Sequence, residues 1–498
     1  MPNDGNFFLI SYLLQQKMSV HLLVLSILCL HCLQLHAHGG ISLKSQQMAL
    51  LHWKSTLRNS PPQMSSWQDH TRPCNWTGIL CTPVRHGRRR LWVVTNISLP
   101  GAGIHGQLGE LNFSALPFLI YINLRKNSLH GAIPANISSL STLSYLDLSN
   151  NWLTGQIPHE IGGIQSLTGL FLVFNNLTGH IPTSLGNLTM LTHLNIHQNM
   201  LSGPIPKEIG KLVSLQSLQL NNNTLSGDIP TSLGNLTQLN LLYIYGNALS
   251  GPIPKEIGKL VSLQSLQLNN NTLCGDIPTS LGNLTQLNLL YLYGNELSGP
   301  IPPELGKLIN LQDLELCINK LTGGIPFSLA NLTKITTLYL HENQITGSIP
   351  PELGKLVNLQ DLDLSSNKFT GAIPVSLANL TKITSLYLYE NQITGSIPPE
   401  LGKLVSLQIL SLDNNTLTGR IPFSLANLTK ITTLYLHENQ VTGSIPPELG
   451  KLVNLQDLGL SSNKLTGAIP FSLANLTKLT RLYLQKNQIT GPIPQELG

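Results

Sequence analysis

The chain has 498 residues, 41% of them hydrophobic and only 11% charged, and its formal net charge is +5. A charge this small over this length gives no case for binding nucleic acid, and uncharged Asn, Ser, Thr and Gln must wet most of the surface. A chain this long would ordinarily divide into about three domains.

The N-terminal segment is predicted to direct export. An apolar run, SVHLLVLSILCLHCLQLHA, ends at Ala37 and is typical of a signal peptide cleaved after Ala37 or Gly39, so we assign residues 1–39 to it. An uncleaved membrane anchor is the alternative interpretation. Met18 is an alternative start, since it would place the apolar core at a more usual distance from the N-terminus of the signal peptide. No later apolar run is long enough to predict a membrane helix.

Residues 40–92 are predicted to form an N-terminal cap domain. The segment CNWTGILC, from Cys74 to Cys81, precedes the first repeat, where a repeat array needs its exposed end covered. We predict a disulfide between these cysteines, which would contribute about 2–3 kcal/mol on the chain-entropy model. A zinc site is not expected here, because it would need four ligands and this segment has only two cysteines. Cys274 and Cys317 lie at different positions of their repeats, so a bond between them is not expected.

Other motifs near the N-terminus indicate no chemistry. GAGIHG, residues 101–106, matches a dinucleotide-binding pattern, but Gly106 occupies a repeat position and no amphipathic helix follows. RHGRRR, residues 85–90, is interpreted as a solvated loop, with a proteolysis or polyanion site as the alternative. His31, His36 and His38 belong to the leader. Without a GxSxG, HExxH or P-loop motif, we predict no enzyme activity, cofactor or metal for this chain.

Residues 93–498 are repetitive. From Asn127 to Asn487 an Asn recurs every 24 residues, giving sixteen units that read roughly LxxLxLxxNxLxGxIPxxLGxL, after a divergent first unit that begins at Ile97. In LxL, two leucines alternate with an outward residue, which predicts a short strand with one buried face. The Asn amide is expected to pair backbone groups inside the coil. We call this Asn of each unit the ladder Asn.

This period is the leucine-rich-repeat signature. It predicts an α/β-type repeat solenoid of about 17 units, the last incomplete, in which each coil covers the next. We expect a horseshoe or superhelix with a parallel β-sheet on its concave face, closed at its N-terminal end by the disulfide-bonded cap.

Fifteen N-x-[ST] sequons support export. Seven of them form an NLT series every 48 residues, which we expect on the convex side, away from the sheet; repeat consensus alone would also explain their recurrence. The predicted glycosylation sites are Asn75, Asn96, Asn112, Asn136, Asn176, Asn187, Asn222, Asn235, Asn270, Asn283, Asn331, Asn379, Asn414, Asn427 and Asn475.

The motifs ALLHWKSTL and SSWQDHTRPCNWTGILC, followed by units with LTGSIP and LSGPIP, resemble the ectodomain of plant leucine-rich-repeat receptor-like kinases over about residues 40–498. The resemblance implies an extracellular domain that binds a peptide or steroid ligand, then a membrane helix and a cytoplasmic Ser/Thr kinase. Because the chain stops at Gly498 inside a repeat, we expect the ectodomain portion of a longer receptor and assign no kinase residue here. The full-length product would lie in the plasma membrane, and a chain that really ends here would be apoplastic.

Two functions remain open. The first is recognition of a secreted peptide, coupled in the full-length product to a leucine-rich-repeat co-receptor and signalling. The second is a secreted inhibitor of a foreign cell-wall-degrading enzyme. An inhibitor should end in a C-terminal cap, whereas a receptor should continue into a membrane helix.

Outward strand positions carry the predicted ligand site. Alternate coils place an aromatic residue four positions before the ladder Asn and a second ring, Tyr or His, two positions before it. Recent duplication explains the period, since residues 203–250 and 251–298 differ at only three positions, but it does not explain why the copied residues are aromatic anchors. Two concave arginines that hold a peptide carboxylate in some family members are not expected, because only Arg125 and Arg481 point outward.

Between Asp313 and Asp457 aromatic and acidic residues combine in a strip that suits a peptide with basic residues. The alternative is an acidic solvated face with inherited tyrosines. The predicted ligand-binding residues are Tyr339, His341, Asp361, Asp363, Tyr387, Tyr389, Glu390, Tyr435 and His437.

Overall fold

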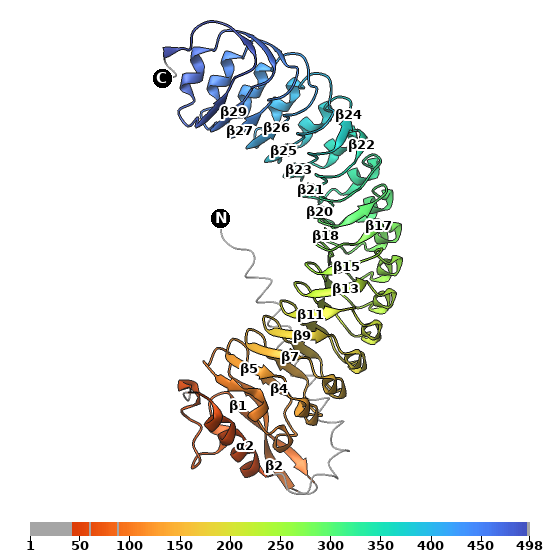
Figure 1. The fold of residues 1–498 in the computed structure, drawn as a ribbon, viewed down its shortest axis with the longest axis vertical. Helices are drawn as coiled ribbons and strands as arrows, with labels where there is room; N and C mark the ends of the chain where they lie inside the picture. The colour runs from red at the N-terminus through yellow and green to blue at the C-terminus, as the bar shows by residue number, and fades with distance from the viewer. Residues whose placement is uncertain (1–41, 59–60, 87–88, 496–498) are drawn as a thin grey trace. The chain divides into compact units, whose positions relative to one another are not determined.

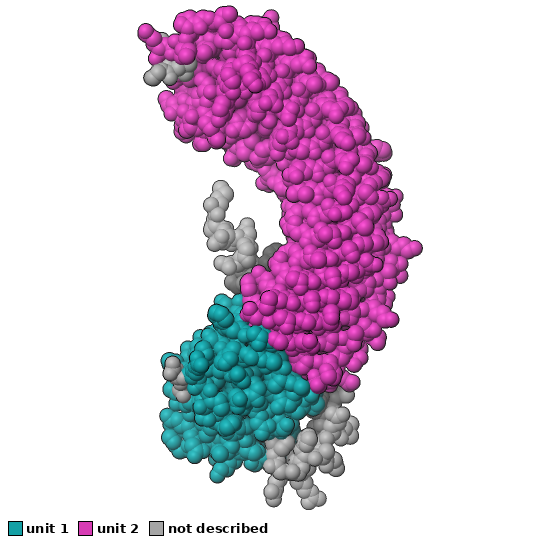
Figure 2. Space-filling view, viewed as in Figure 1, with its two compact units in different colours: residues 1–154 teal, residues 155–498 magenta. Residues whose placement is uncertain are grey.

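The computed structural model describes residues 42–58, 61–86 and 89–495. The predicted signal peptide therefore lies outside the described residues. The chain divides into two compact units, residues 1–154 and 155–498, coloured separately in Figure 2.

The first unit begins with helix α2 (Leu43–Thr56). Ser42 caps it, because its hydroxyl accepts a hydrogen bond from the Ser45 backbone N–H, and the Ser45 hydroxyl accepts one from the Ser42 N–H in return. Trp53 on this helix packs against Trp67, which stacks on Trp76, with ring centroids 6.4 and 5.2 Å apart. These three indoles form the buried centre of the cap.

A disulfide-braced hairpin joins the cap to the repeats. Strands β1 (Ile79–His86) and β2 (Arg89–Ser98) pair antiparallel, and β2 then pairs in parallel with β4 (Tyr121–Asn123), which pairs with β6 (Tyr145–Asp147). Cys74 and Cys81 form the predicted disulfide, with their Cα atoms 5.3 Å apart. In the described part of the chain Cys274 and Cys317 are free, as expected.

Short elements complete the first unit. Strands β3, β5 and β7 form a second parallel ladder, and 3-10 helices connect the strands. Their bounds are η3 (Pro62–Met64), η4 (Pro73–Asn75), β3 (His105–Gln107), η5 (Leu108–Glu110), η6 (Phe113–Ala115), β5 (Ser128–Ala132), η7 (Ala135–Ser139) and β7 (Trp152–Gln156).

The second unit repeats one coil: a three-residue strand, a turn with or without a second short strand, and a 3-10 helix. Figure 1 shows the first strands following one another along the inner side of this unit, and the 3-10 helices on the opposite side. Each first strand pairs in parallel with the corresponding residues of the next coil. The predicted parallel sheet of a leucine-rich-repeat solenoid is therefore confirmed.

The sheet strands are β8 (Gly169–Phe171), β10 (His193–Asn195), β12 (Ser217–Gln219), β14 (Leu241–Tyr243), β16 (Ser265–Gln267), β18 (Leu289–Tyr291), β20 (Asp313–Glu315), β21 (Thr337–Tyr339), β23 (Asp361–Asp363), β25 (Ser385–Tyr387), β26 (Ile409–Ser411), β27 (Thr433–Tyr435), β29 (Asp457–Gly459) and β31 (Arg481–Tyr483). The second strands are β9 (Asn176–His180), β11 (Met200–Gly203), β13 (Thr224–Asp228), β15 (Ala248–Ser250), β17 (Cys274–Asp276), β19 (Glu296–Ser298), β22 (Thr346–Ser348), β24 (Lys368–Thr370), β28 (Thr442–Gly443), β30 (Lys464–Gly467) and β32 (Gln488–Ile489).

The 3-10 helices of this unit are η8 (His159–Gly163), η9 (Thr183–Asn187), η10 (Lys207–Lys211), η11 (Thr231–Asn235), η12 (Lys255–Lys259), η13 (Thr279–Asn283), η14 (Pro303–Lys307), η15 (Phe327–Asn331), η16 (Pro351–Lys355), η17 (Val375–Asn379), η18 (Pro399–Lys403), η19 (Phe423–Asn427), η20 (Pro447–Lys451) and η21 (Phe471–Asn475).

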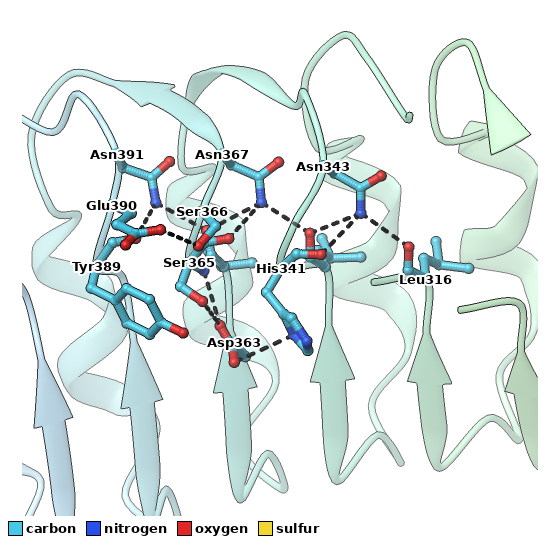
Figure 3. A network of polar contacts seen from close by, with 12 residues as sticks. Leu316, His341, Asn343, Asp363, Ser365, Ser366, Asn367, Tyr389, Glu390 and Asn391 are labelled. Atoms are coloured by element: carbon cyan, nitrogen blue, oxygen red, sulfur yellow. Dashed lines mark hydrogen bonds and ion pairs between the residues drawn. The ribbon is translucent and has the colours of Figure 1, made fainter. Parts of the chain in front are cut away.

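The ladder Asn pairs backbone groups inside the coil, as predicted, and it also joins adjacent coils. The side chain of Asn343 donates to the carbonyl oxygens of Leu316, Leu340 and His341 at 3.0, 3.1 and 3.2 Å, and its oxygen accepts from the Leu321 N–H at 3.0 Å. Figure 3 shows Asn343, Asn367 and Asn391 in line, with their amide groups turned toward the backbone of the coils. Each amide pairs backbone groups that the turn would otherwise leave buried and unpaired.

The residue before each ladder Asn adopts a left-handed backbone conformation or is glycine. Most coils place Asn, Gly or a flexible polar residue there, but Ile318, which is 45% exposed, has a φ of 54°. A β-branched side chain is strained in this region, while Asn tolerates it.

We therefore expect Ile318→Asn to raise the free energy of unfolding by about 1 kcal/mol, measured by guanidinium denaturation. The matched control is Ile309→Asn, because Ile309 is similarly exposed but lies outside the left-handed region. An equal gain in both variants would show that lost hydrophobic exposure, not backbone strain, is responsible.

Candidate functional site

Strand register assembles the predicted site into three rows on the sheet face. The central row contains, in successive coils, Glu315, Tyr339, Asp363, Tyr387, Ser411 and Tyr435. The entry row, two residues earlier, contains Asp313, Thr337, Asp361, Ser385, Ile409, Thr433 and Asp457. The exit row, two residues after the central row, contains His341, Ser365, Tyr389, Asp413 and His437.

In every second coil of these rows, the two aromatic residues of that coil lie edge to face. The ring centroids of Tyr339 and His341 are 5.9 Å apart, and those of Tyr387 and Tyr389 are 6.4 Å apart. Tyr435 and His437 repeat the arrangement at 5.5 Å. These rings are half-buried, so each pair forms a firm, partly exposed aromatic surface on the sheet face.

Asp363 is fixed from two coils. Its Oδ1 accepts hydrogen bonds from the backbone N–H and the hydroxyl of Ser365 at 2.9 and 2.5 Å. Its Oδ2 lies 3.3 Å from Nδ1 of His341, from the preceding coil. Figure 3 shows His341 and Asp363 facing one another across the two strands. The carboxylate is thus held in place on the sheet face, next to Tyr339 and Tyr387.

Asp413 belongs to the same surface but was not among the predicted site residues. Its Oδ2 lies 3.4 Å from Nε2 of His437, and it accepts a hydrogen bond from the hydroxyl of Ser411. Burial raises the pKa of Asp413. Asp413 lies two residues before its ladder Asn, Asn415, just as His341 and Tyr389 lie two residues before theirs. This spacing identifies Asp413 from the sequence as a member of the same row.

Four carboxylates surround Tyr339 on the neighbouring strands β20 and β23: Asp313, Glu315, Asp361 and Asp363. Burial, and then the charges of Asp361, Glu315 and Asp363, raise the pKa of Tyr339 to about 12. Burial and then Asp313 raise the pKa of Glu315. The phenol therefore remains a hydrogen-bond donor at neutral pH within a surface that attracts cations.

Two further predicted residues lie at the borders of this surface. Asp361 accepts a hydrogen bond from the hydroxyl of Thr384 at 3.2 Å, which holds it toward the next coil. Glu390 is exposed and accepts one from the Ser366 hydroxyl at 2.7 Å. All nine predicted residues thus lie on β21 to β27 or in the turns directly after these strands.

The acidic strip ends earlier than predicted. Asp457 is buried and engaged by Arg481, whose Nη2 donates to Oδ2 at 2.8 Å and whose Nε also bonds the carboxylate. Asp457 therefore offers no free charge to a ligand, and Arg481 is occupied by an internal partner.

The predicted glycosylation sites are exposed except for Asn96, which is half-buried. The NLT asparagines are the last residues of their 3-10 helices, on the side opposite the sheet. Across residues 42–58, 61–86 and 89–495, no group of His, Cys, Asp and Glu could hold a metal ion. In the same ranges no helix is long and apolar enough to cross a membrane.

Family models match most of the described chain. The leucine rich repeat N-terminal domain matches residues 43–82, and a leucine-rich repeat region matches 108–251. Further leucine-rich-repeat models match 262–284, 286–308, 309–369, 357–417 and 429–489.

Curated relatives are plant receptor kinases matched over a short segment. The LRR receptor-like serine/threonine-protein kinase RGI3 of Arabidopsis thaliana is 42% identical over 97 residues, which is 19% of this chain and 8% of that protein. The receptor-like kinase SKM1 of the same plant is 34% identical over 90 residues, 18% of this chain and 9% of that protein. These matches span less than a tenth of each relative.

Solved structures match over nearly the whole chain. The ectodomain of the Arabidopsis receptor kinase HAESA, in complex with an IDA peptide hormone, is 33% identical with a TM-score of 0.70, covering 92% of this chain and 80% of that chain. A second HAESA complex, with IDA and the co-receptor SERK1, has the same identity and TM-score and covers 91% and 83%. A bacterial LRR protein from Leptospira interrogans also matches, at 33% identity and a TM-score of 0.62, covering 78% of this chain and 95% of that chain.

Proposed function

Because the chain belongs to the leucine-rich-repeat ectodomains of plant receptor kinases, we propose that it recognises a secreted peptide on the sheet face of its second unit. The observation that carries the proposal is the alternation of carboxylates and aromatic pairs along the central row, from Glu315 to Tyr435. HAESA, its structural relative, is described in complex with a peptide hormone.

The dimensions of the central row suit an extended peptide. Neighbouring strands lie about 4.8 Å apart, so the five steps from Glu315 to Tyr435 span about 24 Å, which an extended chain covers with about seven residues. The backbone groups of these strands are already paired with neighbouring coils, so the peptide would be recognised by side chains rather than by adding a strand.

The charges of the surface select for basic peptides. The four carboxylates around Tyr339 would orient a Lys or Arg side chain, and the tyrosine pairs would supply contact area. Glu390 at the border would add a second contact for a cationic residue. The peptide class is therefore one with at least one basic residue toward the end that lies over Tyr339.

The wider assembly is part of the same proposal. As an ectodomain this chain has an extracellular location, and its curated relatives favour a receptor over a secreted enzyme inhibitor. A full-length product would carry a membrane helix and a cytoplasmic Ser/Thr kinase, and would pair with a leucine-rich-repeat co-receptor when the peptide is bound, as HAESA is described with SERK1.

A random peptide library displayed on phage tests the proposal. We expect selection against the secreted ectodomain to enrich basic peptides, and enrichment to fall when Tyr387→Ala or Asp361→Ala protein is the bait. If no peptide is enriched by the parent protein over an unrelated glycoprotein, the proposed function is wrong.

For a selected peptide, we expect Tyr387→Ala and Asp361→Ala each to weaken binding by about 1–2 kcal/mol, roughly 5- to 30-fold in Kd, measured by calorimetric titration. The matched control is Tyr483→Ala, because Tyr483 occupies the same strand position on β31, beyond Asp457 and Arg481. Unchanged affinity in both test variants would place the site elsewhere on the molecule.

A further inference from the structure

An exposed apolar ridge runs along the helix side of the second unit, away from the ligand site. The first residues of helices η15, η17, η19 and η21 are Phe327, Val375, Phe423 and Phe471. The three phenylalanines are 73%, 70% and 72% exposed, and Val375 is 54% exposed. The helices between them begin with Pro351, Pro399 and Pro447. We call these seven residues the phenylalanine ridge. Phenylalanine is among the residues most often buried in proteins, so a regular exposed series of them is unusual.

The ridge is held in register by the coils. The hydroxyl of Ser328, next to Phe327, donates to the carbonyl oxygen of Pro303 in the preceding helix at 2.7 Å. Ser424 and Ser472 make the same bond to the corresponding prolines at 2.6 Å. Each of these phenylalanines is thus held beside the first residue of the preceding 3-10 helix.

Earlier coils show that the fold does not require these phenylalanines. Helices η9, η11 and η13 begin with Thr183, Thr231 and Thr279, which are exposed. The serines that follow them make the same bond to the preceding helix at 2.6–2.7 Å. The local geometry is therefore alike with Thr or Phe, so the phenylalanines are not needed to form these helices.

Sequons lie on the same helices as the phenylalanines. Asn331, Asn427 and Asn475 are exposed and are the fifth and last residues of the helices that begin with Phe327, Phe423 and Phe471. Four steps of a 3-10 helix advance about 8 Å, a distance that the first sugars of an N-linked glycan can span. A hexose ring and the methyl of an N-acetyl group each offer an apolar surface that packs on an aromatic ring.

We propose that the phenylalanine ridge is covered by the chain's own N-linked glycans, those on Asn331, Asn427 and Asn475 lying over the phenylalanines of their own helices. The inference rests on the export that the proposed function requires. A second copy of the chain fits this surface less well, because Lys355, Lys403 and Lys451 alternate with the sequons and would face like charges across a symmetric contact.

Two triple variants of the secreted ectodomain test whether glycans cover the phenylalanine ridge. Each variant removes three equivalent sequons, which lie beside phenylalanines in one and beside threonines in the other. The first, Thr333→Ala, Thr429→Ala and Thr477→Ala, abolishes the sequons beside the phenylalanines. The second, Thr189→Ala, Thr237→Ala and Thr285→Ala, abolishes three sequons beside threonines. Intact-mass spectrometry confirms the loss of three glycans in each. We expect the first variant to bind several-fold more of the hydrophobic dye ANS than the parent and to aggregate at a lower temperature, and the second to match the parent.

A rescue separates the ridge from a general effect of deglycosylation. Adding Phe327→Thr, Phe423→Thr and Phe471→Thr to the first variant should return dye binding and aggregation temperature to the parent values. Equal effects of the two triple variants, failure of the rescue, or unoccupied sequons in the parent would each overturn the proposal. A glycosylated parent that dimerises through the phenylalanines, shown by a dimer that Phe423→Thr abolishes, would overturn it in favour of self-association.

Binding of a selected basic peptide, measured in the same variants, keeps the two proposals apart. The ridge and the sheet face lie on opposite sides of the coils, so we expect peptide affinity to stay unchanged in both triple variants. If no peptide bound the parent protein, the proposed function would be contradicted, but the dye-binding comparison of the two triple variants would still test the glycan cover.

Discussion

Replacing the ladder residue Asn367 with alanine is expected to lower the free energy of unfolding by about 3–5 kcal/mol. Asn367 is buried, and its Nδ2 donates to the carbonyl oxygens of Leu340, Leu364 and Ser365 at 2.9, 3.3 and 2.9 Å. Its Oδ1 accepts from the Ile345 N–H at 2.9 Å. Alanine would leave these backbone groups without their partner inside the coil, at about 1–3 kcal/mol for each group that stays unpaired.

Asn358→Ala is the matched control for this prediction. The Asn358 side chain also makes two hydrogen bonds, donating to the Thr333 carbonyl oxygen at 2.8 Å and accepting from Lys382 Nζ at 2.7 Å, but both are exposed to solvent. Water replaces them, so we expect a loss below about 1 kcal/mol. Urea denaturation gives the two values, and hydrogen exchange at the Ile345 amide locates the effect. Equal losses in the two variants would refute the role given to the ladder.

Phe369→Ala is expected to cost about 3–5 kcal/mol, because it empties a fully buried site between coils. Phe369 lies on β24 with no exposed surface, and its equivalents in the neighbouring coils are Ile345 and Ile393, which are also buried. The site therefore accepts aliphatic side chains in adjacent coils with the same backbone.

Phe369→Ile separates the loss of volume from the loss of the aromatic ring. We expect it to cost less than about 1.5 kcal/mol, since neighbouring side chains can close around a branched residue. Thermal and urea unfolding of both variants measure the difference. If Ile costs as much as Ala, the ring itself and not the filled volume stabilises this coil.

The repeat features were predictable because their cause is local and periodic. An Asn every 24 residues and leucines at fixed offsets specify which side chains turn inward, and the structure buries Leu338, Leu340 and Leu362 as that spacing requires. The Cys74–Cys81 disulfide was predictable because its partners lie 7 residues apart in a segment with no other cysteine.

The site could be predicted only as far as strand alternation extends. Alternation placed Tyr339, Asp363 and Tyr387 on one face, and the register confirms it. It does not say which outward side chains pair across coils, since that depends on rotamers and burial. The repeat length places Asp413 and His437 side by side in one row, but it does not show that Oδ2 of Asp413 faces Nε2 of His437.

The repeat length specifies which residues of neighbouring coils lie side by side. Arg481 lies 24 residues after Asp457, one coil further in the same row, so the repeat length alone places the two residues side by side. The phenylalanine ridge could not be predicted from strand alternation, because its residues lie at the starts of the 3-10 helices. The exposure of Phe327 depends on how its 3-10 helix is turned, which the leucine pattern does not specify.

The short reach of the ladder bonds has a consequence for inheritance. The Asn343 side chain bonds Leu316 and Leu321, 27 and 22 residues earlier, and otherwise only Leu340 and His341, so its bonds stay within its own coil and the coil before it. A pair of coils lost or gained by unequal recombination would therefore leave every remaining junction chemically the same. Residues 203–250 and 251–298, identical but for three positions, have the form that such an event produces. Gain or loss of 48 codons would therefore leave a chain that still folds, and it would shift the coils of the central row along the array without changing their residues.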